Sequence, residues 1–432
     1  MKRWLKKWWL LLSAIALLTA GGALIFGPKP VAFRVGSPLP KGPVTPKVLV
    51  EKDLGILLAP DGSMWVWGGE TLGSYDSILG TKRAPLTPVQ IGTNTTWRRI
   101  ATTGHGILGI KADGSLWALG WNIHSTLLAP SKGHFLIPFR IGTETNWLDI
   151  SAAGGHVLAL KRDGSLWGWG SNWAGQTGSV LPSRETTTPT RIGVDNDWSK
   201  IAASAATSLA LKSDGTIWAW GQDVNGFGKY GRIPTLFDTD TNWTSVVPGL
   251  NHIMGLRTDG TIWNLGYTSF SPVSSGFAQV GSDSDWVEVI AAFHLFFARK
   301  QDNSWWVAGG SLDQMKRLGG GVMWNRTMGS RAAGEPVPVP FPLQAWAMGM
   351  SSRSVVVLAP DGNLWTWGQA MGERPRMARF APVIRLINRA AKILGAGGEW
   401  IELEEYPNDE SPRLLWKLPE SVARSLGNKG SK

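Results

Sequence analysis

One short motif recurs seven times along this chain, and its repetition limits the possible fold more than any other feature. The motif runs Asp-Gly, two further residues, Trp, two variable residues and Gly, with roughly 50 residues between successive copies. Copies begin at Asp61, Asp113, Asp163, Asp214, Asp259, Asp361 and, in a degraded form, Asp302. A period of this length indicates repeated units that bury their apolar faces against one another.

Each unit is predicted to consist of short strands. Val157–Leu160 is a four-residue apolar run typical of a buried strand. Asp163 and Gly164 form a hairpin signal, because Gly accepts positive φ and Asp can accept hydrogen bonds from the turn. Trp167 and Trp169 are two residues apart and therefore lie on one face of the returning strand. Many short strands with periodic Gly and aromatic residues predict an all-β propeller.

The tryptophan content has a structural explanation in this fold. The chain has 26 Trp and no Cys in 432 residues. A second Trp precedes each apolar strand, at positions 97, 147, 198, 243, 286 and 346. We expect these large side chains to fill the wedge between neighbouring blades. The absence of Cys excludes disulfides, thiol catalysis and cysteine-ligated metals.

The two ends of the repeat region do not decide between two ways of closing the ring. Lys392–Leu403 aligns without gaps on Asp149–Leu160, so Leu415 and Trp416 would match Leu166 and Trp167. These partial units predict a ring closed by pairing N- and C-terminal strands in one blade. We favour seven blades, with eight as the alternative. Helical spacing over residues 383–394 competes with a strand pair there.

The N-terminus is predicted to target the chain to a membrane. Lys2, Arg3, Lys6 and Lys7 precede an uncharged, mostly apolar stretch over residues 8–27, long enough for one spanning helix. The positive flank would keep the N-terminus in the cytoplasm and export the rest. We favour an uncleaved anchor in the inner membrane, with the propeller in the periplasm or outside the cell. The alternative is a signal peptide cleaved near residue 22, which would give a secreted protein.

This layout gives four segments. Residues 1–30 are the anchor or signal, 31–46 a Pro/Gly-rich spacer or first edge strand, 47–420 the propeller, and 421–432 a polar tail. The formal net charge is +11, and the leader contributes a sizeable part of it without any acid. The remaining charge is mild for a chain of this size and does not favour nucleic-acid binding.

The third repeat carries the clearest family signature. Ala152-Ala-Gly-Gly-His156, Asp163-Gly164, Trp167-Gly-Trp-Gly170 and Asn172-Trp-Ala-Gly-Gln-Thr-Gly178 together resemble the regulator of chromosome condensation repeat family. The resemblance covers roughly residues 47 to 420. It implies a seven-bladed propeller used mainly for protein–protein contact. Exchange factors, chromatin binders and a secreted β-lactamase inhibitor belong to this family, and no exchange-factor residue can be mapped onto this chain.

Catalytic and metal-binding motifs are missing from the sequence. There is no phosphate loop, no Gly-x-Ser-x-Gly elbow and no His-Glu-x-x-His pair. His105, His156, His252 and His294 occupy nearly equivalent repeat positions, which favours a structural role in the turn. Asp238–Asn242 imitates the start of a calcium loop but has Trp243 where that loop needs Gly. We therefore predict a polar turn there, and no cofactor or metal.

Departures from the repeat indicate where a partner would bind, because binding residues concentrate on loops over rigid scaffolds. Three segments depart, at residues 311–338, 369–379 and 121–137. Trp and Arg are typical interface anchors. The candidate binding residues are Trp324, Arg326, Arg331, Lys316, Arg317, Trp121, Trp173, Arg374, Arg376 and Arg379.

The sequence therefore predicts a membrane-tethered, exported propeller that binds another protein. It would be a non-catalytic subunit or adaptor of an envelope complex. One alternative is a secreted inhibitor of an exported enzyme. Another is a propeller enzyme acting on glycans, which would need clustered carboxylates where the divergent loops are instead basic.

Overall fold

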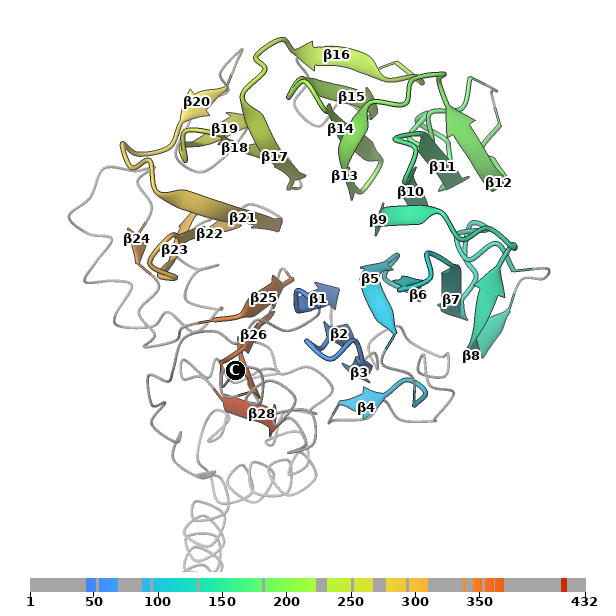
Figure 1. The fold of residues 1–432 in the computed structure, drawn as a ribbon, viewed down its shortest axis with the longest axis horizontal. Coiled ribbons are helices and arrows are strands. Elements are labelled where there is room, and N and C mark those ends of the chain that lie inside the picture. The colour runs from blue at the N-terminus through green and yellow to red at the C-terminus, as the bar shows by residue number, and fades with distance from the viewer. Residues whose placement is uncertain are drawn as a thin grey trace, which may run out of the picture.

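Seven four-stranded antiparallel sheets form a ring in the computed structural model of the chain (Figure 1). This confirms the all-β, seven-bladed propeller. The structure describes residues 44–51, 54–68, 88–93, 96–129, 133–180, 183–222, 231–249, 252–266, 277–292, 295–309, 337–338, 345–351, 354–360, 362–368 and 413–417.

The strands fall into blades in chain order. Blade one is β1 (Lys47–Glu51), β2 (Leu54–Leu58), β3 (Met64–Gly68) and β4 (Val89–Gln90). Blade two is β5 (Trp97–Thr102), β6 (Gly106–Lys111), β7 (Leu116–Trp121) and β8 (His134–Ile141). Blade three is β9 (Trp147–Ala153), β10 (His156–Lys161), β11 (Leu166–Ser171) and β12 (Glu185–Ile192). Blade four is β13 (Trp198–Ser204), β14 (Thr207–Lys212), β15 (Ile217–Gly221) and β16 (Thr235–Asp238).

The remaining blades follow the same scheme. Blade five is β17 (Trp243–Pro248), β18 (His252–Arg257), β19 (Ile262–Gly266) and β20 (Ala278–Gln279). Blade six is β21 (Trp286–Ala292), β22 (Leu295–Lys300), β23 (Trp305–Gly309) and β24 (Val337–Pro338). Blade seven is β25 (Ala347–Met350), β26 (Ser354–Leu358), β27 (Asn363–Gly368) and β28 (Arg413–Lys417).

Strand order within each blade follows the chain from the ring axis outward (Figure 1). The segment containing Arg191 and Ile192 is therefore the outermost strand of blade three, paired with Trp167 and Leu166. The chain then runs from this outer strand to the innermost strand of the next blade, which begins at Trp198.

This path gives the propeller two distinct faces. One face, called the turn face here, carries the Asp-Gly hairpins and the links between blades, such as residues 162–165 and 193–197. The opposite face, called the loop face, carries the turns between first and second strands and the connections between third and fourth strands. Residues 154–155 and 172–184 are examples in blade three.

The hairpins show why the motif needs Asp-Gly. Asp163 Oδ1 accepts hydrogen bonds from the backbone N of Ser165 at 3.0 Å and from its Oγ at 2.6 Å. Gly164 has a φ of 77°, and a Cβ there would lie 1.9 Å from the carbonyl oxygen of Asn196. The turn is thus fixed by a side-chain acceptor and by a backbone contact that only Gly permits.

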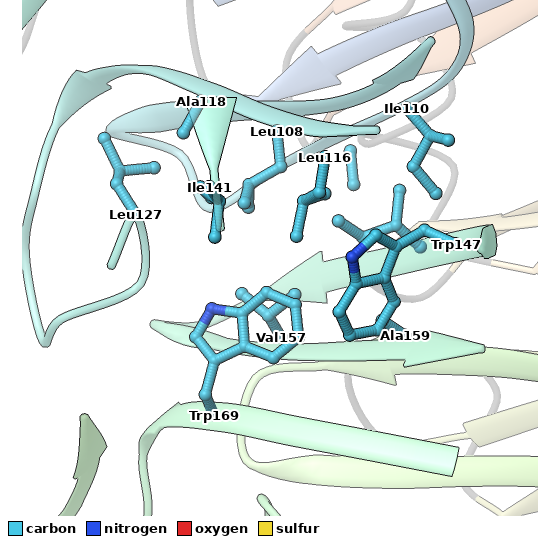
Figure 2. Close-up of a cluster of buried hydrophobic side chains, with 12 residues drawn as sticks. Leu108, Ile110, Leu116, Ala118, Leu127, Ile141, Trp147, Val157, Ala159 and Trp169 are labelled. Carbon is cyan, nitrogen blue, oxygen red and sulfur yellow. The ribbon is translucent and has the colours of Figure 1, made fainter. Parts of the chain in front are cut away.

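Hydrophobic side chains fill the space between neighbouring blades. Figure 2 shows Trp147 and Trp169 of blade three facing Leu108, Leu116 and Ile141 of blade two. Both indoles are almost completely buried. The predicted wedge role of these tryptophans is confirmed.

Closure of the ring differs from the prediction. Blade one is built from residues 47–90 and blade seven from residues 347–417, so among the described strands neither sheet combines strands from both ends of the chain. Trp416 lies in β28, the outermost strand of blade seven, and pairs with Leu364 of β27. It is therefore not the counterpart of Trp167, which lies in the third strand of its blade. Blades one and seven are joined by packing, in a shared core that includes Val48, Trp67 and Val356. The prediction was wrong because sequence similarity of a fragment does not fix which strand it forms.

Other sequence predictions fall outside the described residues. These are the helix and membrane segment over residues 8–27, the spacer up to residue 43, the ambiguous stretch 383–394 and the C-terminal tail 421–432. Within the part of the chain that the structure describes, no helix has the length and apolar character needed to cross a membrane.

The closing contact should tolerate no added volume at Gly349. A Cβ at Gly349 of β25 would lie 2.6 Å from the carbonyl oxygen of Val48 in β1. We expect Gly349→Ala to lower the free energy of unfolding by about 1–3 kcal/mol, the usual cost of overpacking. Urea unfolding measures this effect. Gly133→Ala is the control, because nothing lies within 4 Å of its Cβ position, and equal stability of the two variants would contradict the closure described above.

Candidate functional site

On the turn face, Lys161 is held between two indole rings. Its Nζ lies 4.8 Å from the ring centroid of Trp147 and 3.8 Å from that of Trp167. The two indoles meet edge to face, with centroids 6.0 Å apart. Nζ also pairs with Glu144 Oε1 at 2.7 Å. The ammonium group thus gains cation–π and ionic contacts while its side chain is nearly buried.

This arrangement, which we call the Trp–cation clamp, recurs around the ring. The other clamps of the described residues are Lys111 between Trp97 and Trp117, Lys212 between Trp198 and Trp218, Arg257 between Trp243 and Trp263, and Lys300 between Trp286 and Trp306. The sequence analysis missed these cations. The signal available was a Lys or Arg two residues before five of the seven motif aspartates; Asp61 and Asp361 have Ala there.

A hydrogen-bond chain fixes one indole of each clamp. Trp167 Nε1 donates to Ser165 Oγ at 2.9 Å, and Ser165 Oγ donates to Asp163 at 2.6 Å. The same chain occurs with Ser115 and with the Thr residues at 216 and 261. The hydrogen bonds from Ser165 hold the pKa of Asp163 below its usual value. The motif aspartates are therefore structural carboxylates.

The acidic turns between blades complete the clamps. Lys212 pairs with Asp195 and Asp197, Lys300 with Asp283 and Asp285, and Arg257 with Asp240. Asp238–Asn242 is the polar turn that the sequence predicted, and Asp240 forms an ion pair with Arg257. Among the described residues no group of three or more His, Cys, Asp or Glu could hold a metal ion.

His156 links two blades. Its Nε2 lies 3.0 Å from Ser208 Oγ, and the imidazole is fully buried. Burial lowers the pKa of His156 to about 4, and the carbonyls of Ala153 and Ala205 oppose this shift only weakly. The ring is therefore neutral at pH 7 and acts as a hydrogen-bonding strut. His252 is also buried, whereas His294 lies outside the described residues.

On the loop face, the segment 172–178 is braced from both sides. Asn172 Oδ1 accepts a hydrogen bond from the backbone N of Thr177 at 3.2 Å, and this bond closes the loop. The carbonyl oxygen of Gln176 accepts hydrogen bonds from Ser208 Oγ and Trp220 Nε1 of blade four. Asn172, Gln176 and Thr177 are completely buried. This loop is therefore a rigid joint between blades three and four.

Trp173 projects from this rigid joint into solvent. Its side chain is 58% exposed, although its neighbour Asn172 is buried. The Arg232 side chain donates to the carbonyl oxygen of Asn172 at 3.3 Å, and the backbone N of Asn172 donates to the carbonyl oxygen of Arg184 at 2.6 Å. We call Trp173, Arg184, Arg232 and Ile233 the Trp173 surface; Ile233 is itself 50% exposed.

Trp121 does not share this exposure. It is the last residue of β7, only partly exposed, and its ring meets His105 edge to face at 6.3 Å. Only the two ends of the departing segment 121–137, Trp121 and residues 134–137, belong to the paired strands β7 and β8. Of the two candidates that the structure describes, only Trp173 is positioned as a free anchor.

The other candidate residues lie outside the described residues. They are Lys316, Arg317, Trp324, Arg326, Arg331, Arg374, Arg376 and Arg379. The strand ends that flank their segments are β23–β24 and β27–β28. These are connections between third and fourth strands, like the loop that carries Trp173.

A family model matches blade four. Residues 198–228 match the regulator of chromosome condensation (RCC1) repeat. The chain carries a regulator of chromosome condensation repeat. The match begins at Trp198 of the Trp–cation clamp and spans strands β13 to β15. A comparison by sequence with curated proteins returned no match.

Several solved structures are similar to this chain in fold. Prp20p from Saccharomyces cerevisiae, described with its binding to Gsp1p and histones, has a TM-score of 0.61 and 16% identity, covering 78% of this chain and 85% of its own. Yeast RCC1 (Prp20) bound to Kap60 has a TM-score of 0.59 and 15% identity, covering 80% of this chain and 85% of its own. Human WBSCR16 has a TM-score of 0.60 and 15% identity, covering 72% of this chain and 86% of its own. At these identities the likeness establishes the fold alone.

The Trp–cation clamp should contribute measurably to stability. We expect Lys161→Met to lower the free energy of unfolding by about 1–2 kcal/mol, because two desolvated cation–π contacts and an ion pair are lost. Chemical denaturation measures the change. Arg162→Met is the control, since Arg162 is an exposed neighbour, and its effect should stay within about 0.5 kcal/mol. If both variants were equally stable, the clamp would be only a geometric coincidence.

Proposed function

We propose that this chain is a protein-binding scaffold whose loop face holds the partner. The observation that carries the proposal is the exposed indole of Trp173 on a loop that is otherwise buried and hydrogen-bonded. An anchor held in place in the free protein loses little conformational entropy on binding. Trp is also the residue type most enriched among binding hot spots.

The chemistry around Trp173 supports a partner with acidic and apolar character. Arg184 is exposed, and Arg232 lies across the joint from it. The carboxylate of Glu185, which follows Arg184 in the chain, contacts His124 and Ser125 at 3.2 and 3.4 Å. The Trp173 surface therefore combines an indole, an aliphatic side chain and an excess of positive charge. Solved structures of similar fold include propellers that bind other proteins, and Prp20p is one of them.

Membrane tethering and export are part of the same proposal. The positive residues Lys2 to Lys7 and the apolar stretch 8–27 support an anchor that leaves the propeller outside the cytoplasm. A non-catalytic subunit or adaptor of an envelope complex fits both the anchor and the scaffold. The carboxylates of the turn face are occupied by Lys and Arg side chains or by hydrogen bonds within the turns. This supports a role in binding over one in hydrolysis.

Crosslinking from position 173 tests the placement of the partner. A photoreactive amino acid replacing Trp173 in the membrane-bound chain should crosslink one protein reproducibly. The same group replacing Val194, which is 83% exposed on the turn face, is the control and should not capture that protein.

Binding measured with the purified partner then tests the role of the indole. Trp173→Ala should weaken the Kd by about ten-fold or more, because hot-spot truncations cost about 2 kcal/mol. Thermal stability should be unchanged, because the side chain is exposed. An unchanged Kd, or an equal loss in Val194→Ala, would show that the Trp173 surface is not the binding site.

The state of the N-terminus tests tethering. We expect the intact mass of the chain purified from detergent-solubilised membranes to include residues 1–22. Fractionation should leave the full-length chain with the membrane after a high-salt wash, because an apolar span is not released by charge screening. A mature chain that lacks residues 1–22 and is found in the soluble fraction would instead support the secreted alternative.

A further inference from the structure

One Trp–cation clamp lacks the carboxylate that completes the others. In blades three to six, the clamp cation forms an ion pair with an acid of the turn that precedes its blade, and the pairs are Lys161–Glu144, Lys212–Asp195, Arg257–Asp240 and Lys300–Asp283. In blade two, Lys111 forms no ion pair with any residue that the structure describes. Its Nζ lies 5.1 Å from the ring centroid of Trp97 and 3.4 Å from that of Trp117. We call Lys111, Trp97 and Trp117 the open clamp.

A single difference in sequence distinguishes the open clamp from the others. In each of blades three to six, an acid stands three positions before the first Trp of the clamp, as Glu144 does before Trp147. Blade two has Asn94 three positions before Trp97, and the rest of the segment 92–96 is Gly and Thr. Asn94 itself lies outside the described residues. An amide in place of an acid thus removes the counter-charge that this segment supplies to the other clamps.

The electrostatics of Lys111 differ from those of the paired lysines. Burial lowers the pKa of Lys111, and the charge of Asp113 opposes this shift only in part. Desolvation is also the largest single effect at Lys212 and Lys300, but the hydrogen bonds and charges of their paired aspartates together raise the pKa of both lysines. The positive charge of Lys111 is therefore compensated less than the charge at the same position in blades four and six.

A second cation stands beside the open clamp. Arg98 is the extra residue of the bulge that follows the Trp97–Lys111 pair. Its Nη1 donates to the carbonyl oxygen of Trp97 at 3.0 Å, and Arg98 forms no ion pair with a described residue. Arg98, Lys111 and Trp117 are all partly exposed, so a ligand can reach them from solvent. The corresponding bulge residues of the other described clamps are uncharged, and they are Leu148, Ser199, Thr244 and Val287.

We propose that the open clamp binds an Asp or Glu side chain of a second polypeptide. The carboxylate takes the place that Glu144 has at its own clamp. One partly exposed ion pair gains too little to hold a small free carboxylate, whereas a docked polypeptide presents its side chain at high effective concentration. The carboxylates of the adjacent hairpins, Asp61 and Asp113, are each held by a Ser two residues later. The open clamp lies on the turn face, so it is independent of the Trp173 surface.

Carbodiimide crosslinking tests the proposal, because it joins a carboxylate to an amine that it contacts. The probe is a hexaglutamate peptide with both ends blocked, mixed with the full chain in detergent at low ionic strength, and mass spectrometry identifies the crosslinked lysines. We expect the peptide to be joined to Lys111, and Lys161 to be joined internally to Glu144 as the built-in control. Trp173→Ala should leave the Lys111 crosslink unchanged, which separates this test from that of the proposed function. Displacement of the peptide by an equal concentration of acetate would show a site for free carboxylates and overturn the proposal.

The variant Asn94→Asp closes the clamp from within and should exclude the peptide. We expect the peptide crosslink at Lys111 to fall several-fold, and acylation of the Lys111 amine at alkaline pH to slow several-fold, because a paired amine stays protonated. Asn196→Asp is the matched control, because it adds the same charge to the turn before blade four, where Lys212 is already paired. It should change neither measurement. Absence of a peptide crosslink at Lys111, no loss in Asn94→Asp, or an equal loss in Asn196→Asp would overturn the proposal.

Discussion

Contact between neighbouring blades is the constraint on which the rest of this structure depends. A sheet of four short strands has two apolar faces and cannot cover either by itself. Each blade is therefore stable only against its neighbours, and indoles are the largest of the fully buried side chains. Trp147 and Trp169 bury against blade two, and Trp220 reaches back to the carbonyl of Gln176 in blade three. In this chain, which has no Cys, aromatic packing takes the stabilising role that disulfides have in cysteine-rich domains.

The same packing determines which polar groups are available for function. On the turn face, the lysines and arginines with described clamps are committed to indoles, and most of them also to carboxylates of the inter-blade turns. On the loop face, Asn172 and Gln176 are committed to joining blades. The groups that remain available include the exposed indole of Trp173 on the loop face. The candidates for function are therefore the side chains that take no part in the packing between blades.

The repeated blade residues set the fold and leave the task to individual residues. Propellers of similar fold with 15–16% identity share the ring of blades with this chain. The positions that would distinguish one member from another are the connections between third and fourth strands, because the blade residues are occupied with packing. This division between scaffold and loops is typical of repeat proteins, whose binding surfaces vary on a constant framework.

The sequence by itself determined the strands and the hairpins and favoured seven blades over eight, because these features depend on patterns within about 50 residues. Asp163, Gly164 and Trp167 act on one another locally, and their spacing was enough to predict the turn. Only the tertiary structure decided that Trp416 lies in an outermost strand, that Lys161 sits between two indoles, and that Trp173 is exposed while Trp121 contacts His105. These outcomes depend on neighbours from another strand or blade. Burial and charge balance are properties of such non-local contacts, and no repeat pattern within one unit contains them.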